Sequence, residues 1–233
     1  MLYRSNPLHR RRLAAFYRSF IGPDSLCFDI GAHMGDRIDA WRQLGAHVVA
    51  VEPQPLFAKA LRRRYRDDGR VHLEAVALGE RPGRRTLMIS RRTPTVSTLN
   101  PAWRNVMAVN PRFRGVRWDA ACEVMVRTLD DLIDRYGVPV FCKVDVEGAE
   151  AEVLAGLSYP LPVLSLEYSP AAPEATGACI ARLRELGCYQ YRRSVGESLH
   201  WSGGWMTPEG VLADLGRLEP DQPAGDLYAR RLA

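Results

Sequence analysis

Leu26-Cys27-Phe28-Asp29-Ile30-Gly31-Ala32-His33-Met34-Gly35 decides the fold, because here a short apolar run passes directly into a glycine-bearing turn. A helical pattern follows at 37–44, and a second apolar run, rich in valine, occupies 47–51. Another helical pattern at 55–66 and another run at 71–76 repeat the alternation. Short buried runs that alternate with helical patterns are typical of βαβ units and a parallel sheet.

The second half of the chain continues this alternation as far as residue 186. It predicts strands at 122–126, 138–144 and 163–168, and helices at 129–136, 148–157 and 174–186. The tail has two further runs, at 189–193 and 226–230, separated by a glycine- and tryptophan-bearing stretch at 199–206 and a short helix at 209–215. Such a tail suits an antiparallel edge, so we predict an α/β fold with a mostly parallel sheet.

Two segments depart from the alternation. Residues 1–20 carry apolar side chains at helical spacing among arginines, which predicts an amphipathic helix packed on the body of the protein. Residues 77–118 predict a hairpin with its turn at 81–84, followed by a polar, mobile excursion at 90–110. Long irregular segments in compact domains commonly serve as lids or binding loops.

The composition predicts one globular domain over residues 1–233, because 46% of the residues are hydrophobic and 25% are charged. No apolar run approaches the ~18–20 residues that cross a bilayer, and the first thirty residues lack the apolar core of a signal peptide, so we expect a cytoplasmic protein. Five cysteines without a C-x-x-C pair argue against a disulfide framework and against a zinc site. The pattern indicates no particular oligomeric state.

Four ionisable residues are concentrated where the predicted strand 138–144 ends. Lys143-Val144-Asp145-Val146-Glu147-Gly148-Ala149-Glu150 places them at a point where core packing does not need them. Lys143 is one of only two lysines, although the chain carries 32 basic residues and a net charge of +5. Glu167 ends the apolar run at 163–166. Because ligands of open α/β sheets bind at the carboxyl ends of the strands, we predict a site here.

The glycine turn after the first predicted strand meets the same edge of the sheet. Its glycines permit close backbone approach, and a helix N-terminus follows. Glu52 ends the second run, where a carboxylate can accept hydrogen bonds from ribose hydroxyls. A nicotinamide fingerprint, G-x-G-x-x-G, would require glycine at position 33, where this chain has His33. The missing glycine argues against a dinucleotide pyrophosphate.

These motifs resemble a known family. The pattern D-x-G-x-x-x-G at Asp29–Gly35, with an acidic residue after the next strand, is similar to class I S-adenosylmethionine-dependent methyltransferases. The segment 143–156, together with Thr128-Leu129-Asp130-Asp131-Leu132, resembles the FkbM-type methyltransferase family. Further similarities carry the resemblance from about 28 to 167: Asp29-Ile30-Gly31-Ala32, Val51-Glu52-Pro53, Ala75-Val76-Ala77-Leu78-Gly79 and Leu166-Glu167.

The resemblance implies a Rossmann-like sheet of seven strands, with helices on both faces, that binds S-adenosylmethionine and releases S-adenosylhomocysteine. It implies O-methylation of a hydroxyl on a small acceptor, a sugar or a secondary metabolite. By position, Asp29, Gly31 and Gly35 would frame the methionine part, with His33 lending backbone contacts, while Glu52 holds the ribose. Val76 and Ala77 would border the adenine, and Ser97-Thr98-Leu99 resembles a segment that covers the site.

Methyl transfer to a hydroxyl requires the acceptor oxygen in line with the sulfonium and without its proton. We predict that Asp145 lies nearest the methyl, that Glu147 orients the acceptor or acts as general base, and that Lys143 keeps neighbouring carboxylates ionised. The alternative is a buried Lys143–Asp145 pair that only fixes the strand. Glu167 could contact the acceptor or join Asp145 around a divalent cation; in the absence of a metal-dense motif we predict no metal ligand.

Two other functions remain open at this stage. The basic N-terminal helix would suit an RNA or protein methyltransferase, although Asp145-Val146-Glu147-Gly148 stands where an amine-methylating enzyme would carry an N-P-P-Y-like motif. A non-catalytic protein that binds S-adenosylmethionine is the third hypothesis. Nucleic acid is the less favoured partner, because the predicted site is rimmed by carboxylates rather than by arginines.

Overall fold

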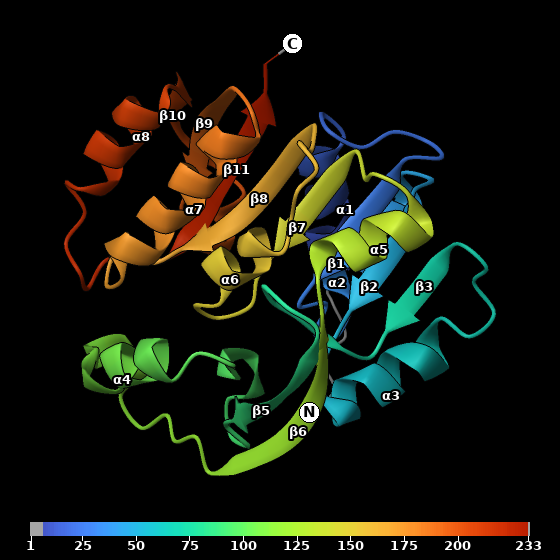
Figure 1. The fold of residues 1–233 in the computed structure, drawn as a ribbon. Coiled ribbons are helices and arrows are strands. Elements are labelled where there is room, and N and C mark those ends of the chain that lie inside the picture. Colours follow the sequence, from blue (N-terminus) through green and yellow to red (C-terminus); the bar gives the residue numbers. More distant parts are fainter. Residues whose placement is uncertain (1–6, 233) are drawn as a thin grey trace.

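The computed structural model describes residues 7–232, and its centre is a twisted sheet with helices on both faces (Figure 1). Eight strands lie in the order β10-β9-β11-β8-β7-β1-β2-β3. The pairs from β8 to β3 are parallel, and those that β11, β9 and β10 make are antiparallel. The bounds are β1 (Leu26–Ile30), β2 (His47–Val51), β3 (Val71–Glu74), β7 (Phe141–Val144), β8 (Val163–Tyr168), β9 (Tyr189–Ser194), β10 (Trp201–Met206) and β11 (Gly225–Arg231).

The predicted fold class, a mostly parallel α/β sheet with an antiparallel edge, is confirmed, but the sheet has one strand more than expected. The additional strand is β10, which lies in the stretch interpreted from sequence as a connection. Gly203 and Gly204 interrupt its pattern, and glycine weakens a strand interior. Packing compensates for them, because the Arg192 guanidinium stacks over Trp201 and that of Arg230 over Trp205.

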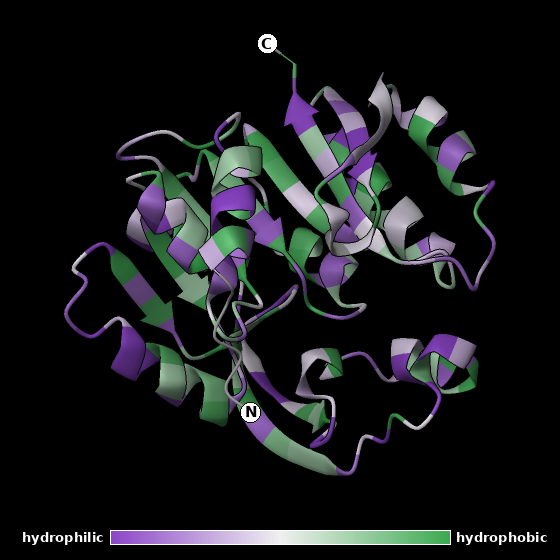
Figure 2. Ribbon diagram, turned by 180° about the vertical axis from the view of Figure 1, so that it is seen from behind, coloured by the Kyte–Doolittle hydropathy of each residue, from purple (hydrophilic) through white to green (hydrophobic). Residues whose placement is uncertain are grey.

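Two hydrophobic layers sandwich the sheet, and Figure 2 shows hydrophobic residues concentrated along its strands. One face packs on α5, α6, α7 and α8, through residues such as Leu132, Val153 and Ile180. The other face packs on α1, α2 and α3, through Tyr17, Trp41 and Leu61. The helices are α1 (Pro7–Tyr17), α2 (Asp36–Gln43), α3 (Pro55–Arg64), α5 (Leu129–Tyr136), α6 (Glu150–Ala155), α7 (Pro173–Leu186) and α8 (Pro208–Leu215).

A second, three-stranded sheet replaces the hairpin predicted for residues 77–89. Its order is β4-β6-β5, so β4 (Ala77–Leu78) and β5 (Gly83–Ile89) do not pair with each other. Each pairs with β6 (Ala120–Arg127), β4 in parallel and β5 antiparallel. The run at 122–126 therefore belongs to this small sheet and not to the main one. Its alternating exposure explains the difference, because a strand of the central parallel sheet would be buried on both faces.

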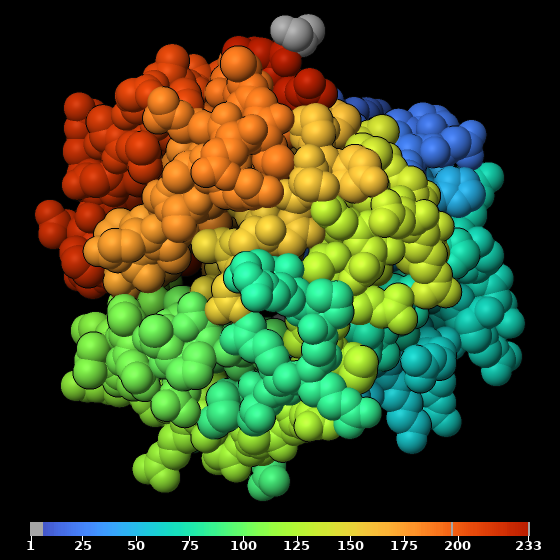
Figure 3. Space-filling view, in the orientation of Figure 1, coloured from blue at the N-terminus to red at the C-terminus, as the bar shows by residue number. Residues whose placement is uncertain are grey.

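The excursion after β5 contains regular structure of its own. A 3₁₀ turn, η1 (Pro94–Val96), is followed by α4 (Pro101–Val109) and a second 3₁₀ turn, η2 (Pro111–Phe113). The Asn100 side chain caps α4 by accepting hydrogen bonds from the backbone N–H groups of Ala102 and Trp103. Figure 3 shows this turquoise and green segment lying against the yellow residues near the end of β7. The excursion is thus placed over the strand ends.

The N-terminal helix α1 packs on the sheet through Leu13, Ala14 and Tyr17. Residues 1–6 of the helix predicted at 1–20 lie outside the described part of the chain. Beyond its end, Phe20 stacks on Phe141 and Tyr228. Within residues 7–232, no helix combines the length and apolar character that crossing a membrane requires.

Candidate active site

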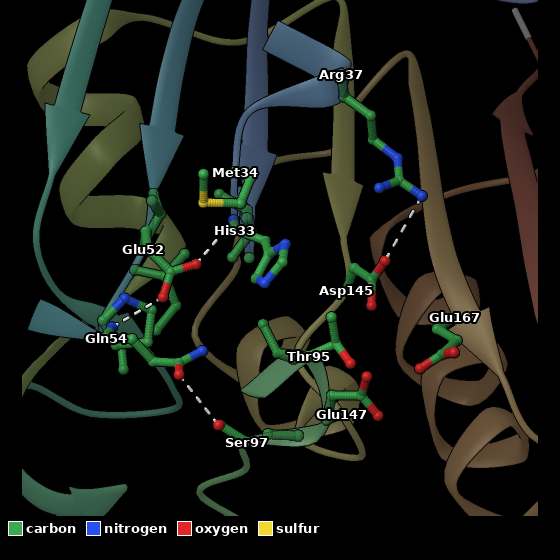
Figure 4. A pocket seen from close by; sticks show the side chains of 18 of the residues that line it. His33, Met34, Arg37, Glu52, Gln54, Thr95, Ser97, Asp145, Glu147 and Glu167 are labelled. Carbon is green, nitrogen blue, oxygen red and sulfur yellow. Dashed lines mark hydrogen bonds and ion pairs between the residues drawn. The ribbon is translucent and has the colours of Figure 1, made fainter. Parts of the chain in front are cut away.

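A cavity of about 410 Å³ opens at the carboxyl ends of the parallel strands. It lies around the junction of β1 with β7, where the strand order reverses direction, which is the position where open α/β sheets bind their ligands. Figure 4 shows two groups of polar side chains facing each other across the cavity. Glu52, Gln54 and Ser97 form one group; Asp145, Glu147 and Glu167 form the other.

The glycine turn after β1 is shaped by its neighbours in the fold. Gly31 has φ +87°, and a Cβ atom there would overlap the backbone carbonyl of Asp145. Glycine is therefore required for the approach of two strand ends. Gly35 (φ +85°) lies against the phenol of Tyr65 and does not line the cavity. Asp29 also lies behind the lining, and burial raises its pKa to about 6.

Glu52 is the buried carboxylate at the end of β2, with 2% of its surface exposed. Its two oxygens accept hydrogen bonds of 2.8 Å from the backbone N–H groups of His33 and Gln54. Burial raises the pKa of Glu52 to about 7, although both hydrogen bonds act to lower it. Each oxygen retains a lone pair for a ligand hydroxyl, so this carboxylate can hold a ribose.

The ring of His33 projects between the two polar groups of the cavity (Figure 4). The residue adopts φ +46°, and its ring packs 4.3 Å from that of Phe57. Its buried Nε2 makes no hydrogen bond to any described residue. Burial lowers its pKa, so the ring is neutral at physiological pH. The sequence interpretation gave His33 backbone contacts alone, whereas the structure adds an imidazole edge that faces the ligand space.

Lys143 connects the strand ends below the cavity. Its ammonium is fully buried and meets two carboxylates, Asp226 Oδ1 at 2.6 Å and Asp145 Oδ2 at 3.2 Å. The guanidinium of Arg37 approaches the same Asp145 oxygen, at 3.7 Å. These cations hold the pKa of Asp145 below its ordinary value against the effect of burial. The expected pairing of Lys143 with Asp145 is present. In addition, Asp226 pairs with Lys143, and Arg37 pairs with Asp145.

Glu147 and Glu167 lie beside Asp145 but without close contact to either cation. One oxygen from each of the three carboxylates falls within 4.8 Å of the other two. Burial, and then the neighbouring negative charges, raise the pKa values of Glu147 and Glu167 well above the ordinary value. Carboxylates crowded in this way share protons or take up a cation. The structure thus brings together the three acidic residues that the sequence placed at the ends of two strands.

The excursion fixes the loop that carries Glu147. Thr98 Oγ1 donates a hydrogen bond of 2.7 Å to the Glu147 carbonyl, and Asn100 Nδ2 donates one of 2.6 Å to the Gly148 carbonyl. Glu147 adopts φ +55°, a conformation that needs such support. From the other side, the Glu150 carboxylate accepts hydrogen bonds from the N–H groups of Val146 and Gly148.

The excursion also reaches the opposite wall of the cavity. Ser97 Oγ donates to Gln54 Oε1 at 3.2 Å, and Gln54 Nε2 donates to the Pro94 carbonyl at 3.1 Å. The segment from Thr95 to Leu99 therefore lies between the Glu52 side and the Glu147 loop and forms one wall of the cavity. This position agrees with the covering role that the sequence resemblance implied for 97–99.

Most residues singled out from the sequence meet in this cavity. The lining includes Gly31, His33, Glu52, Ala77, Asp145, Glu147 and Glu167. Asp29, Gly35, Val76 and Lys143 lie outside it; Asp29 and Lys143 are buried behind the strand ends. Sequence reasoning missed five lining residues. Three of them lie within two residues of motif positions: Met34, Arg37 and Gln54. The other two, His9 and Leu13, come from α1, and no motif in the sequence linked that helix to the site.

A comparison with known families identifies the family of the chain. The family model of the FkbM methyltransferase domain matches residues 29–190, which is more than two thirds of the chain and includes the carboxyl ends of the parallel strands β1, β2, β3, β7 and β8. The chain belongs to the FkbM methyltransferase family. It is accordingly an S-adenosylmethionine-dependent methyltransferase.

Two solved structures to which this FkbM methyltransferase is similar have low sequence identity to it. The precorrin-6y C5,15-methyltransferase of Geobacter metallireducens is 11% identical, with a TM-score of 0.50, over 98% of this chain and 89% of its own. A TehB-like S-adenosylmethionine-dependent methyltransferase of Corynebacterium glutamicum is 8% identical, with a TM-score of 0.47, over 97% and 100%. A search of curated proteins finds no significant match.

The cavity of this FkbM methyltransferase suits the cofactor that its family uses. Glu52 is a buried carboxylate with lone pairs to spare, and the Nε2 of His33 is a buried polar atom without a partner among the described residues. Ala77, Leu78 and Leu87 add an apolar wall. A ligand with a hydroxyl-bearing ribose and a flat base matches this combination of groups.

Proposed function

We propose that this protein transfers a methyl group from S-adenosylmethionine to a hydroxyl of a small, carbohydrate-like acceptor or secondary metabolite. The observation that carries the proposal is the group formed by Asp145, Glu147 and Glu167 at one end of the cavity, across from Glu52. One end then holds the nucleoside, and the other receives the acceptor.

Cofactor binding is assigned to the residues around the first two strand ends. Glu52 accepts hydrogen bonds from the ribose, His33 and Gly31 border the centre of the ligand, and Ala77 lies along the base. Asp29, behind Gly31, adds negative charge below the methionine part. The bound cofactor supplies an electrophilic methyl group on its sulfonium, and the cation is favoured by the surrounding carboxylates.

The three carboxylates orient the acceptor hydroxyl and accept its proton. Asp145 is kept ionised by Lys143 and Arg37, so it can accept a hydrogen bond and orient the acceptor hydroxyl. Burial and the neighbouring carboxylates raise the pKa values of Glu147 and Glu167, so the ionised member of this pair is a stronger base than an ordinary carboxylate. The pair would take the proton of the acceptor hydroxyl, while the bound cofactor would supply the methyl group to that oxygen.

The same groups define the acceptor class. Asp145, Glu147 and Glu167 offer hydrogen-bond acceptors, which match the donors of a polyhydroxylated molecule. A phosphorylated or carboxylated end placed among them would be repelled. Because the cavity of about 410 Å³ must hold the cofactor as well, it leaves room for only one small ring or chain of the acceptor. We therefore expect neutral hydroxyl compounds to be methylated before anionic ones.

Exposed arginines near the cavity support RNA as an alternative methyl acceptor. Arg11 and Arg12 are exposed on α1, the helix whose His9 and Leu13 line the cavity. RNA bound there would dissociate steeply with salt. Titration of the protein into labelled RNA at two salt concentrations tests this alternative, and salt-sensitive binding together with methyl transfer to RNA would replace the small acceptor.

Calorimetry and a transfer assay test the proposal together. The protein should bind S-adenosylmethionine and S-adenosylhomocysteine, and should move a labelled methyl group onto neutral polyhydroxylated compounds in a panel or metabolite extract. Asp145→Asn should lower transfer by about a hundredfold or more while both cofactor forms still bind. If neither cofactor form binds, the proposed methyltransferase function is refuted. Binding without transfer to any acceptor would indicate a non-catalytic binding protein.

A further inference from the structure

Lys143 makes its shorter contact with a residue outside the motifs of the site. The ammonium lies 2.6 Å from Asp226 Oδ1, and 3.2 Å from Asp145 Oδ2. Asp226 belongs to β11, the last strand of the chain, and sits opposite Glu167 in the antiparallel register. Directly opposed residues of an antiparallel pair point to the same face, so Asp226 lies on the face of the sheet that carries Glu167.

Both oxygens of Asp226 are engaged inside the protein. Oδ1 meets the Lys143 ammonium, and Oδ2 accepts a hydrogen bond of 3.3 Å from the hydroxyl of Tyr228. The side chain of Asp226 is 13% exposed, and Asp226 does not line the cavity. Tyr228 is itself fully buried between the aromatic rings of Phe16 and Phe20. Asp226 is therefore held in place from behind the cavity and is not among the residues that line it.

A fully buried ammonium needs a fixed counter-charge, because a charge in a low-dielectric interior is costly without one. Asp145 and Asp226 are the two carboxylates within ion-pair distance of Lys143 in the described part of the chain. Asp145 lines the cavity, where we assign it a role toward the acceptor. One of its oxygens pairs with Lys143 and Arg37, and the other is turned toward Glu147 (Figure 4). If Asp226 lost its charge, Asp145 would become the sole partner of Lys143.

We propose that Asp226 is a positioning residue for methyl transfer, which anchors the Lys143 ammonium so that the Asp145 carboxylate remains turned toward the cavity. This inference rests on the proposed function of Asp145. Asp226 acts through Lys143 and touches neither cofactor nor acceptor. Its removal should therefore lower the rate of transfer and leave cofactor affinity nearly unchanged.

Asp226→Asn, which keeps the shape of the side chain, is the first variant. We expect kcat to fall by about tenfold or more, with the Kd for S-adenosylhomocysteine within about threefold of the wild type. The effect should vanish when Lys143 is absent: Lys143→Met/Asp226→Asn should be no slower than Lys143→Met alone. An equal further loss in the Lys143→Met background would overturn the proposal, because Asp226 would then act independently of the lysine.

Asp214→Asn is the matched control for damage to folding. Asp214 pairs with Arg193 at 2.5 Å in the same C-terminal region, and neither residue lines the cavity. Both aspartate variants should lower the thermal midpoint, but only Asp226→Asn should lower kcat. A proportionate fall of kcat in both variants, or a fall of cofactor affinity in Asp226→Asn as large as that of kcat, would reduce Asp226 to a structural residue.

A measurement without turnover separates this inference from the proposed function. The chain has two lysines, so lysine labelled with ¹⁵N gives two Nζ signals in NMR, with exposed Lys59 as the internal reference. At constant pH, Asp226→Asn should move the Nζ signal of Lys143, because the nearest oxygen to that ammonium, 2.6 Å away, then belongs to a neutral side chain, and should leave the Lys59 signal unchanged. An unchanged Lys143 signal refutes the anchoring, whether or not an acceptor is known.

The Lys143 signal must be interpreted against every described titratable group that acts electrostatically on the ammonium. From α1, α2, β1, β7, β8, β11 and the loop after β7, these groups are Tyr17, Arg37, Asp29, Cys142, Glu167, Asp226, Asp145 and Glu147. Asp226→Asn changes the charge of one of them alone. A shift of Lys143 in this variant that is absent in Asp214→Asn is thus assigned to the lost carboxylate.

Discussion

Gly148 and Trp103 lie so close that a Cβ atom on the glycine would overlap the indole ring. Gly148 directly follows Glu147 in the carboxylate loop, and Trp103 belongs to α4 of the excursion. The tryptophan is buried, and hydrogen bonds from Thr98 and Asn100 hold the same loop. The absent side chain of Gly148 thus allows the excursion to dock on the acceptor end of the cavity.

Gly148→Ala should therefore displace the excursion and impair methyl transfer. The new methyl group forces Trp103 away, and with it the support of the Glu147 backbone. We expect kcat to fall by about tenfold or more, while the cofactor, held by the first two strands, binds with similar affinity. Gly115→Ala is the control, since Gly115 has the same positive φ, of +86°, within the excursion but open space around it. Equal losses in both variants would assign the effect to backbone strain.

Replacement of Glu52 tests the nucleoside end. Glu52→Gln removes the charge that strengthens the expected ribose hydrogen bonds, which are worth about 1.5–3 kcal/mol when one partner is charged. Calorimetry should show S-adenosylhomocysteine binding weakened by roughly 10–100-fold. Glu74→Gln is the matched control, because Glu74 ends the neighbouring strand β3 but bonds to Arg135 and Tyr136 outside the cavity. Unchanged affinity in Glu52→Gln would remove the carboxylate from the cofactor site.

The sequence motifs predicted the residues at neighbouring strand ends but not the contact of Lys143 with Asp226, and the reason is chain separation. Gly31 and Glu52 follow consecutive strands, so periodicity and turn chemistry were enough to bring them together. Asp226 reaches Lys143 across 83 positions of sequence. Its place depends on how β11 inserts beside β8, which the alternation of apolar residues does not specify. The small sheet was mispredicted for a related reason, since β6 pairs with two strands from earlier in the chain.

Cofactor affinity should fall as the pH drops through 7. Burial raises the pKa of Glu52 to about 7 in the cofactor-free protein, so the carboxylate that accepts ribose hydrogen bonds becomes protonated below that pH. Well below pH 7, the affinity for the cofactor should fall by at most about tenfold for each pH unit. Asp29, with a pKa of about 6, would contribute only at lower pH. Calorimetric titrations from pH 5.5 to 8.5 test this, and Glu52→Gln must flatten the dependence between pH 6 and 8 if Glu52 is its source.

Methyl transfer should survive treatment with a chelator, although Asp145, Glu147 and Glu167 lie close enough together to hold a cation. Lys143 and Arg37 already place positive charge on the Asp145 carboxylate, and their field opposes a divalent ion at that oxygen. The raised pKa values of Glu147 and Glu167 favour a shared proton in its place. Enzyme dialysed against EDTA should therefore keep its kcat and its pH profile. If activity disappears and returns with Mg²⁺ or Mn²⁺, the three carboxylates are cation ligands, and Glu147→Gln should then weaken the response to added metal.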